Sequence, residues 1–416
     1  MKILIVSTHE KLGGAAIAAH RLMEALNNNG GDAKMLVLSK QSNNPNVIQV
    51  GSKLMNKVRF IVERLTIFMK NGFTKKNLFD ISIANTGVSI TNHPEFKQAD
   101  IIHLHWINQG MLSINEIGNI LSSGKKVVWT MHDMWSFTGI CHHAKECNHF
   151  KTVCGLCPYL ISPSKDDISN ATFLQKETTY SLGSIHFVSV SSWLTKQAKS
   201  SPLVKNHKIS TIPNVIDTDI FTQTKSVNTE LNKVIGNRKT IIMGAARLDH
   251  PIKGFEYLKE ALNILVNSNM LNPNDLFLLL FGKVKYPKLF FNNIPIKYLH
   301  IGSIQNKQDI AQLYSTADVT VVPSLYETFG QTITEAMACG CPAVSFNNSG
   351  QTDIIDHQVN GYLAKYKDVR DFAKGIYWAL YEADKKTIAN ACRSKVLENY
   401  SEKTIAEKYL DIYNQD

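Results

Sequence analysis

Short apolar runs alternate with amphipathic stretches along the first half of the chain. Each run has the length and composition of a buried strand, and each amphipathic stretch repeats its apolar residues at helical spacing. The pattern predicts strands at 2–7, 35–38, 100–105, 127–131, 186–190 and 208–213, and helices at 14–28, 114–121, 170–182 and from Ser191 onward.

The second half of the chain restarts the same alternation. The pattern predicts strands at 240–245, 276–282 and 318–322 and helices at 254–267, 309–317, 331–339 and 401–413. Alternating strands and helices imply parallel sheets with right-handed crossovers. We therefore predict an α/β fold of two doubly wound, Rossmann-like domains facing a cleft, with residues 1–212 in the first domain and 213–400 in the second.

Composition limits the classes of protein to which the chain can belong. The 416 residues are enough for two ordinary domains, and a hydrophobic content of 44% supports full cores rather than disorder. No run of about 18 apolar residues is present, so the sequence predicts no membrane span. The apolar run at 2–7 is too short for a signal peptide and fits a buried strand, so we expect a cytoplasmic protein.

Charge adds a preference for acidic partners. The formal charge of +10 favours nucleotide phosphates, an anionic membrane surface or nucleic acid. No common nucleic-acid-binding motif is present, so no nucleic-acid partner is expected. Apolar residues recur at helical spacing over 54–69, and the basic residues around them are Lys53, Lys57, Arg59, Arg64, Lys70, Lys75 and Lys76. This stretch is either a helix packed on its own domain or a surface for peripheral contact with an anionic membrane.

The segment 323–342, PSLYETFGQTITEAMACGCP, carries the most specific candidate chemistry. Glu327 falls in a loop between a predicted strand and a predicted helix, and Glu335 falls inside that helix. A helix N-terminus presents free N–H groups that suit a phosphate, and a carboxylate can accept two hydrogen bonds from a ribose diol. The segment therefore indicates a sugar-nucleotide site. The alternative is a helix with two surface glutamates.

Further candidates lie at predicted strand ends, where parallel sheets bind ligands. Gly13-Gly14 follows the first strand, and it either lets a ligand approach the backbone or only makes a turn. Arg247 and Lys253 either clamp a diphosphate or lie in a solvated loop. His132 either serves a sugar substrate or is structural.

Four cysteines gather in the segment CHHAKECNHFKTVCGLC, and they are Cys141, Cys147, Cys154 and Cys157. The last two form a C-x2-C pair around a glycine, a spacing that suits a metal-ligand turn. A reducing compartment disfavours disulfides, so a structural zinc on these thiols is the first interpretation. Possible alternate ligands are His142, His143 and His149. Thiols without metal, a disulfide and an iron–sulfur cluster are the other interpretations.

The order of these motifs resembles that of retaining GT-B glycosyltransferases, in particular the large family 4. Glu327 and Glu335 match the E-x7-E signature of that family. Arg247 and Lys253 match its arginine and its Lys-Gly pair, and His132 matches its histidine in a T-x-H-D context. The resemblance covers nearly the whole chain, from the Gly-Gly loop to the closing helix.

Two features set this chain apart within the resemblance. Ala245-Ala246 stands where the family more often has glycine before the arginine. The Cys-rich insertion, which begins HDMW-x-F-T-G-x-C, is similar to that of a subset of family 4 enzymes resembling those of bacterial exopolysaccharide pathways, including the colanic-acid type. Because the insertion follows His132 directly, the resemblance implies that it shapes the acceptor side.

The resemblance implies a role for each matched residue. Glu327 contacts hydroxyls of the donor sugar, Glu335 holds the nucleotide ribose, and Arg247 and Lys253 bind the departing diphosphate. Further donor contacts come from the loop of Gly13 and Gly14 and from the backbone amides of Phe329, Gly330, Gln331 and Thr332. His132 stabilises the transition state or binds a sugar hydroxyl, so the implied catalytic set is His132, Glu327, Arg247 and Lys253.

The implied activity is that of a retaining hexosyltransferase that needs no metal for its chemistry. Such an enzyme would move a sugar from a UDP-, GDP- or dTDP-sugar to a hydroxyl of a saccharide or lipid-linked saccharide in surface polysaccharide biosynthesis. The resemblance also implies that the C-terminal helix, 401–416, packs back on the N-terminal domain. Two alternatives are a sugar-nucleotide epimerase on the same fold and a non-enzymatic, basic, zinc-containing nucleic-acid-binding protein.

Overall fold

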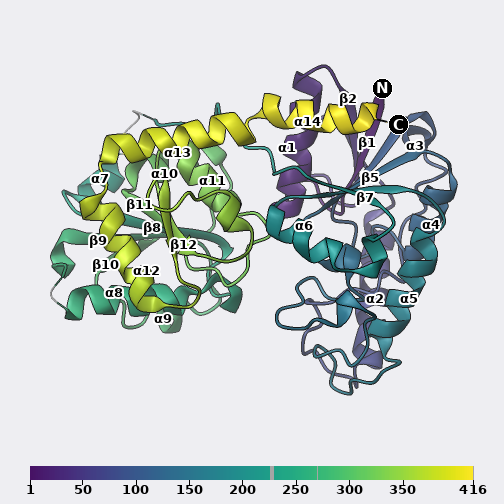
Figure 1. Ribbon diagram of the computed structural model, residues 1–416, viewed down its shortest axis with the longest axis horizontal. Helices are drawn as coiled ribbons and strands as arrows, with labels where there is room; N and C mark the ends of the chain where they lie inside the picture. Colours follow the sequence, from purple (N-terminus) through teal and green to yellow (C-terminus); the bar gives the residue numbers. More distant parts are fainter. Residues whose placement is uncertain (225–228, 269, 416) are drawn as a thin grey trace. The chain divides into compact units, whose positions relative to one another are not determined.

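The computed structural model describes residues 1–224, 229–268 and 270–415. The chain divides into two compact units (Figure 1): unit 1 holds Met1–Pro213 and Ile405–Asp416, and unit 2 holds Asn214–Thr404. Each unit is a parallel sheet with helices packed on it. The predicted class, α/β with two doubly wound, Rossmann-like sheets, is thus confirmed. The change of unit after Pro213 lies beside the boundary that the sequence predicts.

Unit 1 is built on a seven-stranded sheet in the order β3-β2-β1-β4-β5-β6-β7. Its strands are β1 (Lys2–Val6), β2 (Asp32–Val37), β3 (Val47–Gln49), β4 (Ile101–Leu104), β5 (Lys126–Met131), β6 (Ile185–Ser189) and β7 (Lys208–Thr211). Strand β1 pairs in parallel with β2 on one side and with β4 on the other. The direction in which the chain adds strands therefore reverses between β1 and β4, and doubly wound sheets bind ligands beside such a reversal.

The helices of unit 1 follow the strands in the crossover positions that a parallel sheet requires. They are α1 (Gly14–Asn28), α2 (Lys53–Lys70), α3 (Pro94–Gln98), α4 (Ile114–Ser122), α5 (Ile168–Tyr180) and α6 (Ser192–Lys199). Short 3-10 turns occur at Trp135–Phe137, His149–Lys151 and Pro202–Val204. The last helix, α14 (Glu402–Asn414), packs on this sheet: the Tyr409 hydroxyl lies 2.8 Å from Thr130 Oγ1, and the Tyr413 hydroxyl lies 2.6 Å from His103 Nδ1.

Unit 2 is built on a six-stranded parallel sheet in the order β10-β9-β8-β11-β12-β13. Its strands are β8 (Lys239–Arg247), β9 (Leu276–Lys283), β10 (Lys297–His300), β11 (Val319–Val322), β12 (Ala343–Phe346) and β13 (Gly361–Ala364). Strand β8 pairs with β9 on one side and with β11 on the other. The strand order therefore reverses between β8 and β11, as it does between β1 and β4 in unit 1.

The helices of unit 2 are α7 (Thr229–Ile235), α8 (Phe255–Asn267), α9 (Pro287–Phe290), α10 (Lys307–Thr316), α11 (Gln331–Ala338), α12 (Val369–Tyr377) and α13 (Lys385–Tyr400). A short π-helical segment, Trp378–Glu382, follows α12 directly. Helix α11 ends where the sequence predicts, because Gly340 has a positive φ of 77° and Pro342 blocks any continuation. No helix among the described residues is long and apolar enough to cross a membrane.

The central strands read as unbroken apolar runs because helices cover both faces of each sheet. Strand β9, LFLLLFGK, is buried at every position except its last. Every run that the sequence predicts as a strand overlaps an observed strand, with ends shifted by a few residues. The sequence analysis did not identify β3, β10, β12 and β13, each of three or four residues.

Candidate active site

In unit 2 the predicted site residues lie at the reversal between β8 and β11. The loop after β8 carries Arg247 and Lys253, and the loop after β11 carries Glu327. The backbones of the two loops meet: Leu325 N donates to Ile252 O at 2.8 Å. Two neighbouring strands thus deliver basic and acidic side chains to the carboxyl edge of one sheet, the edge at which such sheets bind ligands.

Lys253 and Glu327 form an ion pair, with 2.7 Å between Lys253 Nζ and Glu327 Oε1. Both side chains are partly exposed, at 29% and 15%, so a ligand can still reach the pair. The next residue, Gly254, allows the two loops to come close enough to form this ion pair. Its φ is +67°, and an added Cβ would lie 1.9 Å from the carbonyl oxygen of Pro323. Only glycine fits a left-handed position that close to a neighbouring backbone.

Arg247 lies apart from this pair at the end of β8. Its Nε donates to Asp249 Oδ1 at 3.0 Å, and its side chain is 57% exposed. The hydrogen bond from Arg247 lowers the pKa of Asp249. The structure therefore brings Lys253 and Glu327 together and places Arg247 on a different carboxylate nearby in sequence.

Helix α11 follows the Glu327 loop and begins after Gly330, whose φ is +123°. No side chain caps its N-terminus, the end at which the first-turn N–H groups of a helix can bind a phosphate. The side chain of Phe329 is buried, with its ring against Tyr400 at 5.6 Å between centroids, so only its backbone can serve a ligand. Glu335 lies half-buried farther along the helix.

The sequence analysis missed a supporting loop, 347–351, which follows β12. Ser349 Oγ accepts a hydrogen bond from Glu327 N at 3.1 Å, and Gly350 N donates to Glu327 O at 2.7 Å. Asn348 Nδ2 donates to Leu325 O at 2.7 Å. These bonds attach the Glu327 loop to the loop after β12 at Leu325 and at Glu327. The available signal was Asn-Asn-Ser-Gly directly after an apolar run, a turn composition at another strand end.

In unit 1 the Gly13-Gly14 loop lies at the reversal between β1 and β4. Gly13 has a φ of +91° and precedes α1, whose N-terminus no side chain caps. An added Cβ at Gly13 would meet nothing within 4 Å, so its left-handed φ, not crowding, requires glycine. Thr8, earlier in the same loop, donates from its backbone N to Trp106 O and from Oγ1 to Asn108 O. The loops after β1 and β4 are thus tied together.

His132 directly follows β5 and joins a chain of hydrogen-bonded side chains. His132 Nε2 lies 2.9 Å from His105 Nδ1. The ring of His105 packs 4.3 Å from that of His103, whose Nε2 lies 2.8 Å from Thr130 Oγ1. The side chains of His103 and His105 are both buried. The sequence analysis missed the contact between His105 and His132, because the two residues follow different strands, β4 and β5.

Burial keeps these imidazoles neutral. It lowers the pKa of His132 to about 4, against the opposing effect of Asp133. It lowers the pKa of His103 to about 3, with smaller contributions from His132 and His186. The pKa of His105 is lowered well below its usual value, again mainly by burial. At neutral pH His132 can therefore donate or accept a hydrogen bond but carries no positive charge.

Asp133 continues this network toward the Cys-rich insertion. Its Oδ2 accepts from Trp106 Nε1 at 2.8 Å and lies 2.6 Å from His142 Nδ1. The other ring nitrogen of His142 lies 3.1 Å from Ser82 Oγ. Despite the opposing effect of burial, interactions with His142 help to hold the pKa of Asp133 near 2. Both ring nitrogens of His142, one of the possible alternate ligands, are thus engaged by Asp133 and Ser82.

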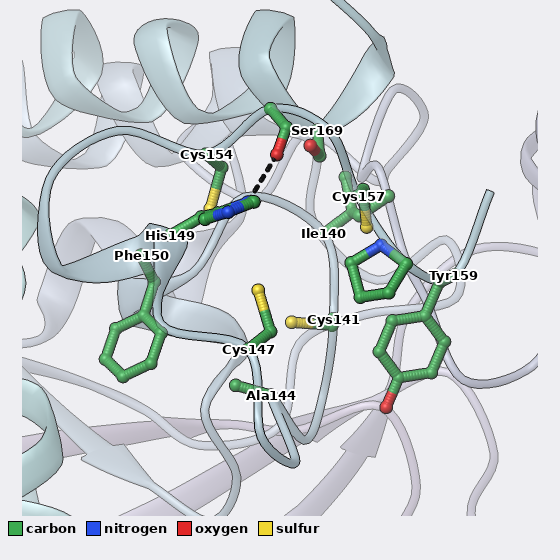
Figure 2. Close-up of a pocket in the computed structure, with 12 residues that line it drawn as sticks. Ile140, Cys141, Ala144, Cys147, His149, Phe150, Cys154, Cys157, Tyr159 and Ser169 are labelled. Atoms are coloured by element: carbon green, nitrogen blue, oxygen red, sulfur yellow. Dashed lines mark hydrogen bonds between the residues drawn. The ribbon is translucent and has the colours of Figure 1, made fainter. Parts of the chain in front are cut away.

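The four cysteines of the insertion line one small cavity of about 20 Å³, together with His149 (Figure 2). All four are free thiols. Cys154 Sγ accepts a hydrogen bond from Gly139 N at 3.2 Å. His149 Nδ1 donates to Gly155 O at 2.7 Å, the dashed line in Figure 2, which leaves Nε2 as the acceptor of that ring. Burial raises the pKa of Cys154 and of Cys157 to about 11, so without a metal these thiols stay protonated.

The cavity does not hold these side chains at metal-binding distances. Across residues 1–224, 229–268 and 270–415, no three histidine, cysteine or acidic side chains lie close enough together to hold a metal ion. The four thiols share the cavity as the sequence predicts, but a zinc ion would have to draw them closer. The structural zinc therefore stays a prediction.

A separate hollow of about 700 Å³ lies in unit 2 and holds none of the predicted site residues. Its lining includes Lys239 at the start of β8, Asp318 just before β11 and Pro342 just before β12. The hollow therefore opens at the amino ends of the strands, away from the Lys253–Glu327 pair. Because doubly wound sheets bind ligands at their carboxyl ends, we place the candidate site at the pair.

Comparison with known proteins finds a family match within unit 2. Residues 229–393 match the family described as "Glycosyl transferases group 1". An uncharacterised glycosyltransferase of Methanocaldococcus jannaschii is 28% identical over 337 residues, which cover 76% of this chain and 83% of that protein. A UDP-Gal:α-D-GlcNAc-diphosphoundecaprenol α-1,3-galactosyltransferase of Escherichia coli is 24% identical over 212 residues, covering 50% of this chain and 54% of that protein.

Solved structures match over the whole chain. A sucrose-phosphate synthase from Thermosynechococcus elongatus gives a TM-score of 0.66 at 18% identity, covering 100% of this chain and 98% of that chain. Anabaena HepE in complex with UDP and glucose gives a TM-score of 0.64 at 17% identity and covers 99% of both chains. At such identities the likeness shows the fold, which is GT-B. Together with the match over 229–393, it supports a glycosyltransferase.

Proposed function

We propose that this chain is a retaining hexosyltransferase of family 4 that moves a sugar from a nucleotide sugar to a hydroxyl of a saccharide or lipid-linked saccharide. The observation that carries the proposal is the Lys253–Glu327 pair, 2.7 Å apart, at the strand reversal of unit 2. Helix α11 begins just beyond it with no side-chain cap. A cation, a sugar-binding carboxylate and a helix N-terminus in one strand-loop-helix unit suit a sugar diphosphate.

The proposed chemistry needs no metal because the protein supplies the positive charge. As the bond between the anomeric carbon and the diphosphate breaks, negative charge grows on the departing oxygen. Lys253, Arg247 and the N-terminus of α11 would stabilise that charge. The acceptor hydroxyl forms the new bond on the face that the diphosphate leaves, and its proton passes to the departing diphosphate. The anomeric configuration is therefore retained.

Glu327 has two roles in this scheme. Without donor it neutralises Lys253, which otherwise would lie partly buried without a counter-charge. When a diphosphate arrives, the phosphate oxygens replace the carboxylate as partner of Lys253, and Glu327 is released to accept hydrogen bonds from the sugar hydroxyls. Glu335, farther along α11, would hold the ribose.

His132 would act as a neutral hydrogen-bonding group in unit 1. Because its pKa is lowered to about 4, the side chain cannot offer a positive charge to the reaction at neutral pH. It can bind a sugar hydroxyl, with its Nε2 already fixed by His105. The acceptor side is therefore proposed to be held by hydrogen bonds, and the donor side by charge.

The acceptor is proposed to be a sugar on a surface polysaccharide or its lipid-linked precursor, used at the inner face of the cell membrane. One relative supports this: the Escherichia coli protein named above transfers to a diphosphoundecaprenol-linked sugar by its name. That name gives UDP-galactose as the donor of the relative, and Anabaena HepE was solved with UDP and glucose. We accordingly propose a UDP-sugar as the first donor to test, ahead of GDP- and dTDP-sugars.

The decisive experiment is calorimetric binding of UDP-, GDP- and dTDP-sugars to the whole chain, with Glu335→Ala alongside. Selective micromolar binding of one nucleotide, weakened at least about tenfold by Glu335→Ala, would support the donor site. Glu398→Ala, an exposed position on α13, is the matched control and should bind as the native chain does. If the folded protein binds no sugar nucleotide, the proposal is wrong, and the nucleic-acid alternative should be tested by salt-dependent retention.

Product analysis separates transfer from epimerisation. Incubation with the bound donor and a saccharide acceptor should release nucleoside diphosphate together with a new glycosidic bond of unchanged anomeric configuration, which NMR detects. A change in the free sugar nucleotide with no acceptor consumed would instead show an epimerase.

For the Cys-rich insertion we propose a structural zinc held by Cys141, Cys147, Cys154 and Cys157. Its support is that the four thiols line one cavity and that a backbone N–H already donates to one sulfur. Metal analysis of protein purified without chelator should find about one zinc per chain. Four titratable thiols and no metal would overturn the assignment.

A further inference from the structure

Helix α2 turns its polar side chains inward and its apolar side chains outward. Its buried residues are Asn56, Glu63, Arg64 and Ile67, so three of the four are polar or charged. A helix packed on its own domain shows the opposite arrangement, with an apolar stripe toward the core. The sequence left two interpretations of this helix open, and the inverted burial argues against simple packing.

The exposed side of α2 is a continuous apolar stripe. Each of its side chains is between 41% and 71% exposed, and they are Leu54, Met55, Val58, Ile61, Val62, Leu65 and Met69. Most recur at spacings of three or four residues, so they share one face over the whole length of the helix. Phe73 and Phe79, in the segment that follows, are 72% and 63% exposed and extend the apolar surface beyond the helix.

Buried hydrogen bonds fix the helix in this orientation. Asn56 Nδ2 donates to Leu38 O at 3.2 Å and to Val50 O at 2.9 Å. Glu63 Oε1 accepts from the backbone N–H groups of Ile83 and Ala84, at 3.0 Å each. These side chains satisfy the backbone of neighbouring loops. The helix therefore cannot roll to bury its stripe without leaving buried polar groups unpaired, which is costly.

Arg64 adds a second attachment on the same buried side. Its guanidinium donates to Leu78 O, to Ile81 O at 2.9 Å and to Ser82 Oγ at 3.2 Å, and it lies 3.1 Å from Glu63 Oε1. The segment after the helix is thereby tied down as well. The apolar stripe and the phenylalanines beyond it belong to one held surface of unit 1.

The charges around the stripe have one sign. The exposed lysines are Lys53, Lys57, Lys70, Lys75 and Lys76. Between Ser52 and Phe79 the only acidic residue is Glu63, which is buried against backbone N–H groups and Arg64. An apolar band with cations at both ends is complementary to a bilayer surface, where acyl chains lie beneath anionic headgroups.

The same charge pattern argues against a second copy of the chain as the partner. Face-to-face contact of two stripes would bring the lysines of both copies together with no exposed carboxylate in this segment to offset them. Like charges opposed at an interface are unfavourable. Anionic lipids remove that repulsion and cover the apolar band at the same time.

We propose that α2 is a membrane-docking element, which lies in the plane of an anionic bilayer with the stripe from Leu54 to Met69 inserted at the boundary between headgroups and acyl chains. The contact is peripheral, because the helix carries a buried polar side that stays on the protein. It would place unit 1 on the membrane. This inference does not depend on the proposed transfer reaction, since it concerns a surface remote in sequence from the donor-site loops.

The test is flotation of the whole chain with vesicles, in the absence of donor and acceptor. Vesicles of phosphatidylcholine alone are compared with vesicles that contain phosphatidylcholine and phosphatidylglycerol in equal amounts. Both are tested at low and at high salt. The native chain should bind the anionic vesicles at least about tenfold better, with high salt weakening the binding. Equal binding to both vesicles, or none, would overturn the proposal.

A double substitution then locates the contact. Ile61→Ser with Leu65→Ser should lower vesicle binding by roughly tenfold or more, because two inserted side chains are lost. The matched control is Leu174→Ser with Leu397→Ser, two exposed leucines on other helices, at 45% and 42% exposure. The control should bind as the native chain does. Equal losses in both variants would contradict a specific role for α2.

Two further measurements exclude unfolding and self-association as causes of weaker vesicle binding. Thermal melting should be unchanged by Ile61→Ser with Leu65→Ser, because both side chains are exposed, so weaker binding cannot be ascribed to unfolding. Sedimentation velocity without vesicles should show the same state for the native chain and this variant. A native dimer that the variant abolishes would overturn the proposal in favour of self-association.

Discussion

The two units have similar folds, but their candidate site residues differ in charge and in exposure. In unit 2 the candidate residues are charged and partly exposed, and they meet as an ion pair between two neighbouring loops. In unit 1 they are neutral histidines, buried or half-buried, and hydrogen-bonded across neighbouring strands. Three of the 14 histidines lie in unit 2, at 250, 300 and 357, and the other eleven lie in unit 1.

The difference shows that residues at a strand end can serve in two ways, either as accessible ligand-binding groups or as part of the core. A charged group that must meet a diphosphate has to remain accessible, so it contributes little to the stability of its unit. A buried imidazole is part of the core, so the unit depends on its protonation state. Substitutions at the unit 2 site should therefore affect activity first, and protonation in unit 1 should affect stability first.

The largest expected effect is on transfer activity. Lys253→Ala should lower kcat by about 100-fold or more, because a preorganised cation at a departing diphosphate supplies several kcal/mol. Unfolding should change little, since the pair is partly exposed. The measurement is steady-state release of nucleoside diphosphate, beside urea unfolding of the same variant.

The control for this substitution is Lys259→Ala, which also breaks a lysine–glutamate pair. Lys259 Nζ lies 2.6 Å from Glu256 Oε2 within α8. That variant should keep nearly full activity. If both variants lost activity alike, the distinction between a reacting cation and a structural pair would fail.

The next largest effect is the pH dependence of unit 1. A histidine whose pKa falls on folding binds more protons unfolded than folded, so the free energy of unfolding falls as the pH drops from about 6.5, the unfolded pKa, toward the folded pKa, and it levels off below that value. For His132, with a folded pKa of about 4, the loss reaches about 3 kcal/mol. Burial of His103 and His105 acts in the same direction.

Urea unfolding at pH 7.5, 6 and 5 measures this loss. Trp378 is the only one of the five tryptophans in unit 2, so Trp378→Phe leaves a fluorescence signal from unit 1. The free energy of unfolding of unit 1 should fall between pH 7.5 and 5, and His132→Gln should make the dependence shallower. A free energy that is constant over this range would contradict buried, neutral imidazoles.

A third prediction concerns how closely the unit 2 loops approach each other. Gly254→Ala should cost about 2 to 4 kcal/mol, because a left-handed φ and a Cβ 1.9 Å from Pro323 O act together. Gly236→Ala shares the left-handed φ, +64°, but its Cβ would meet only Arg238 Nη1, at 3.7 Å. It should cost about 1 kcal/mol. Equal costs from denaturant unfolding would show that the loops can separate without penalty.

The two units also differ in what the sequence could predict. In unit 2 the site is local: Glu327, the start of α11 and Glu335 lie within nine residues of one another, and a strand-loop-helix pattern places them in order. The Lys253 contact could be anticipated because loops after adjacent strands meet. The Asn348–Gly350 loop was not anticipated, because the strand before it, β12 (Ala343–Phe346), was not recognised as a strand.

In unit 1 the arrangement depends on contacts between distant segments. The hydrogen bond between His105 and His132 joins two strands, and its histidines carry no spacing that predicts the pairing. The orientation of α2 likewise depends on loops at 38, 50 and 83–84 that accept or donate its buried hydrogen bonds. Periodicity located the stripe but could not show which face is buried.

The smallest expected effect tests whether the loop missed by the sequence analysis supports the site. Asn348→Ala removes the hydrogen bond to Leu325 O and should cost about 1 kcal/mol of unfolding free energy. Because Leu325 lies two residues before Glu327, donor binding should weaken as well, by a few-fold. Asn399→Ala is the control: its amide donates to Lys395 O within α13, so a similar loss of stability should leave donor affinity unchanged. Calorimetry of both variants separates the cases. If Asn348→Ala lost stability but bound donor as the native chain does, the charged site of unit 2 would be held by its own loop alone, and its contrast with the network of unit 1 would be sharper still.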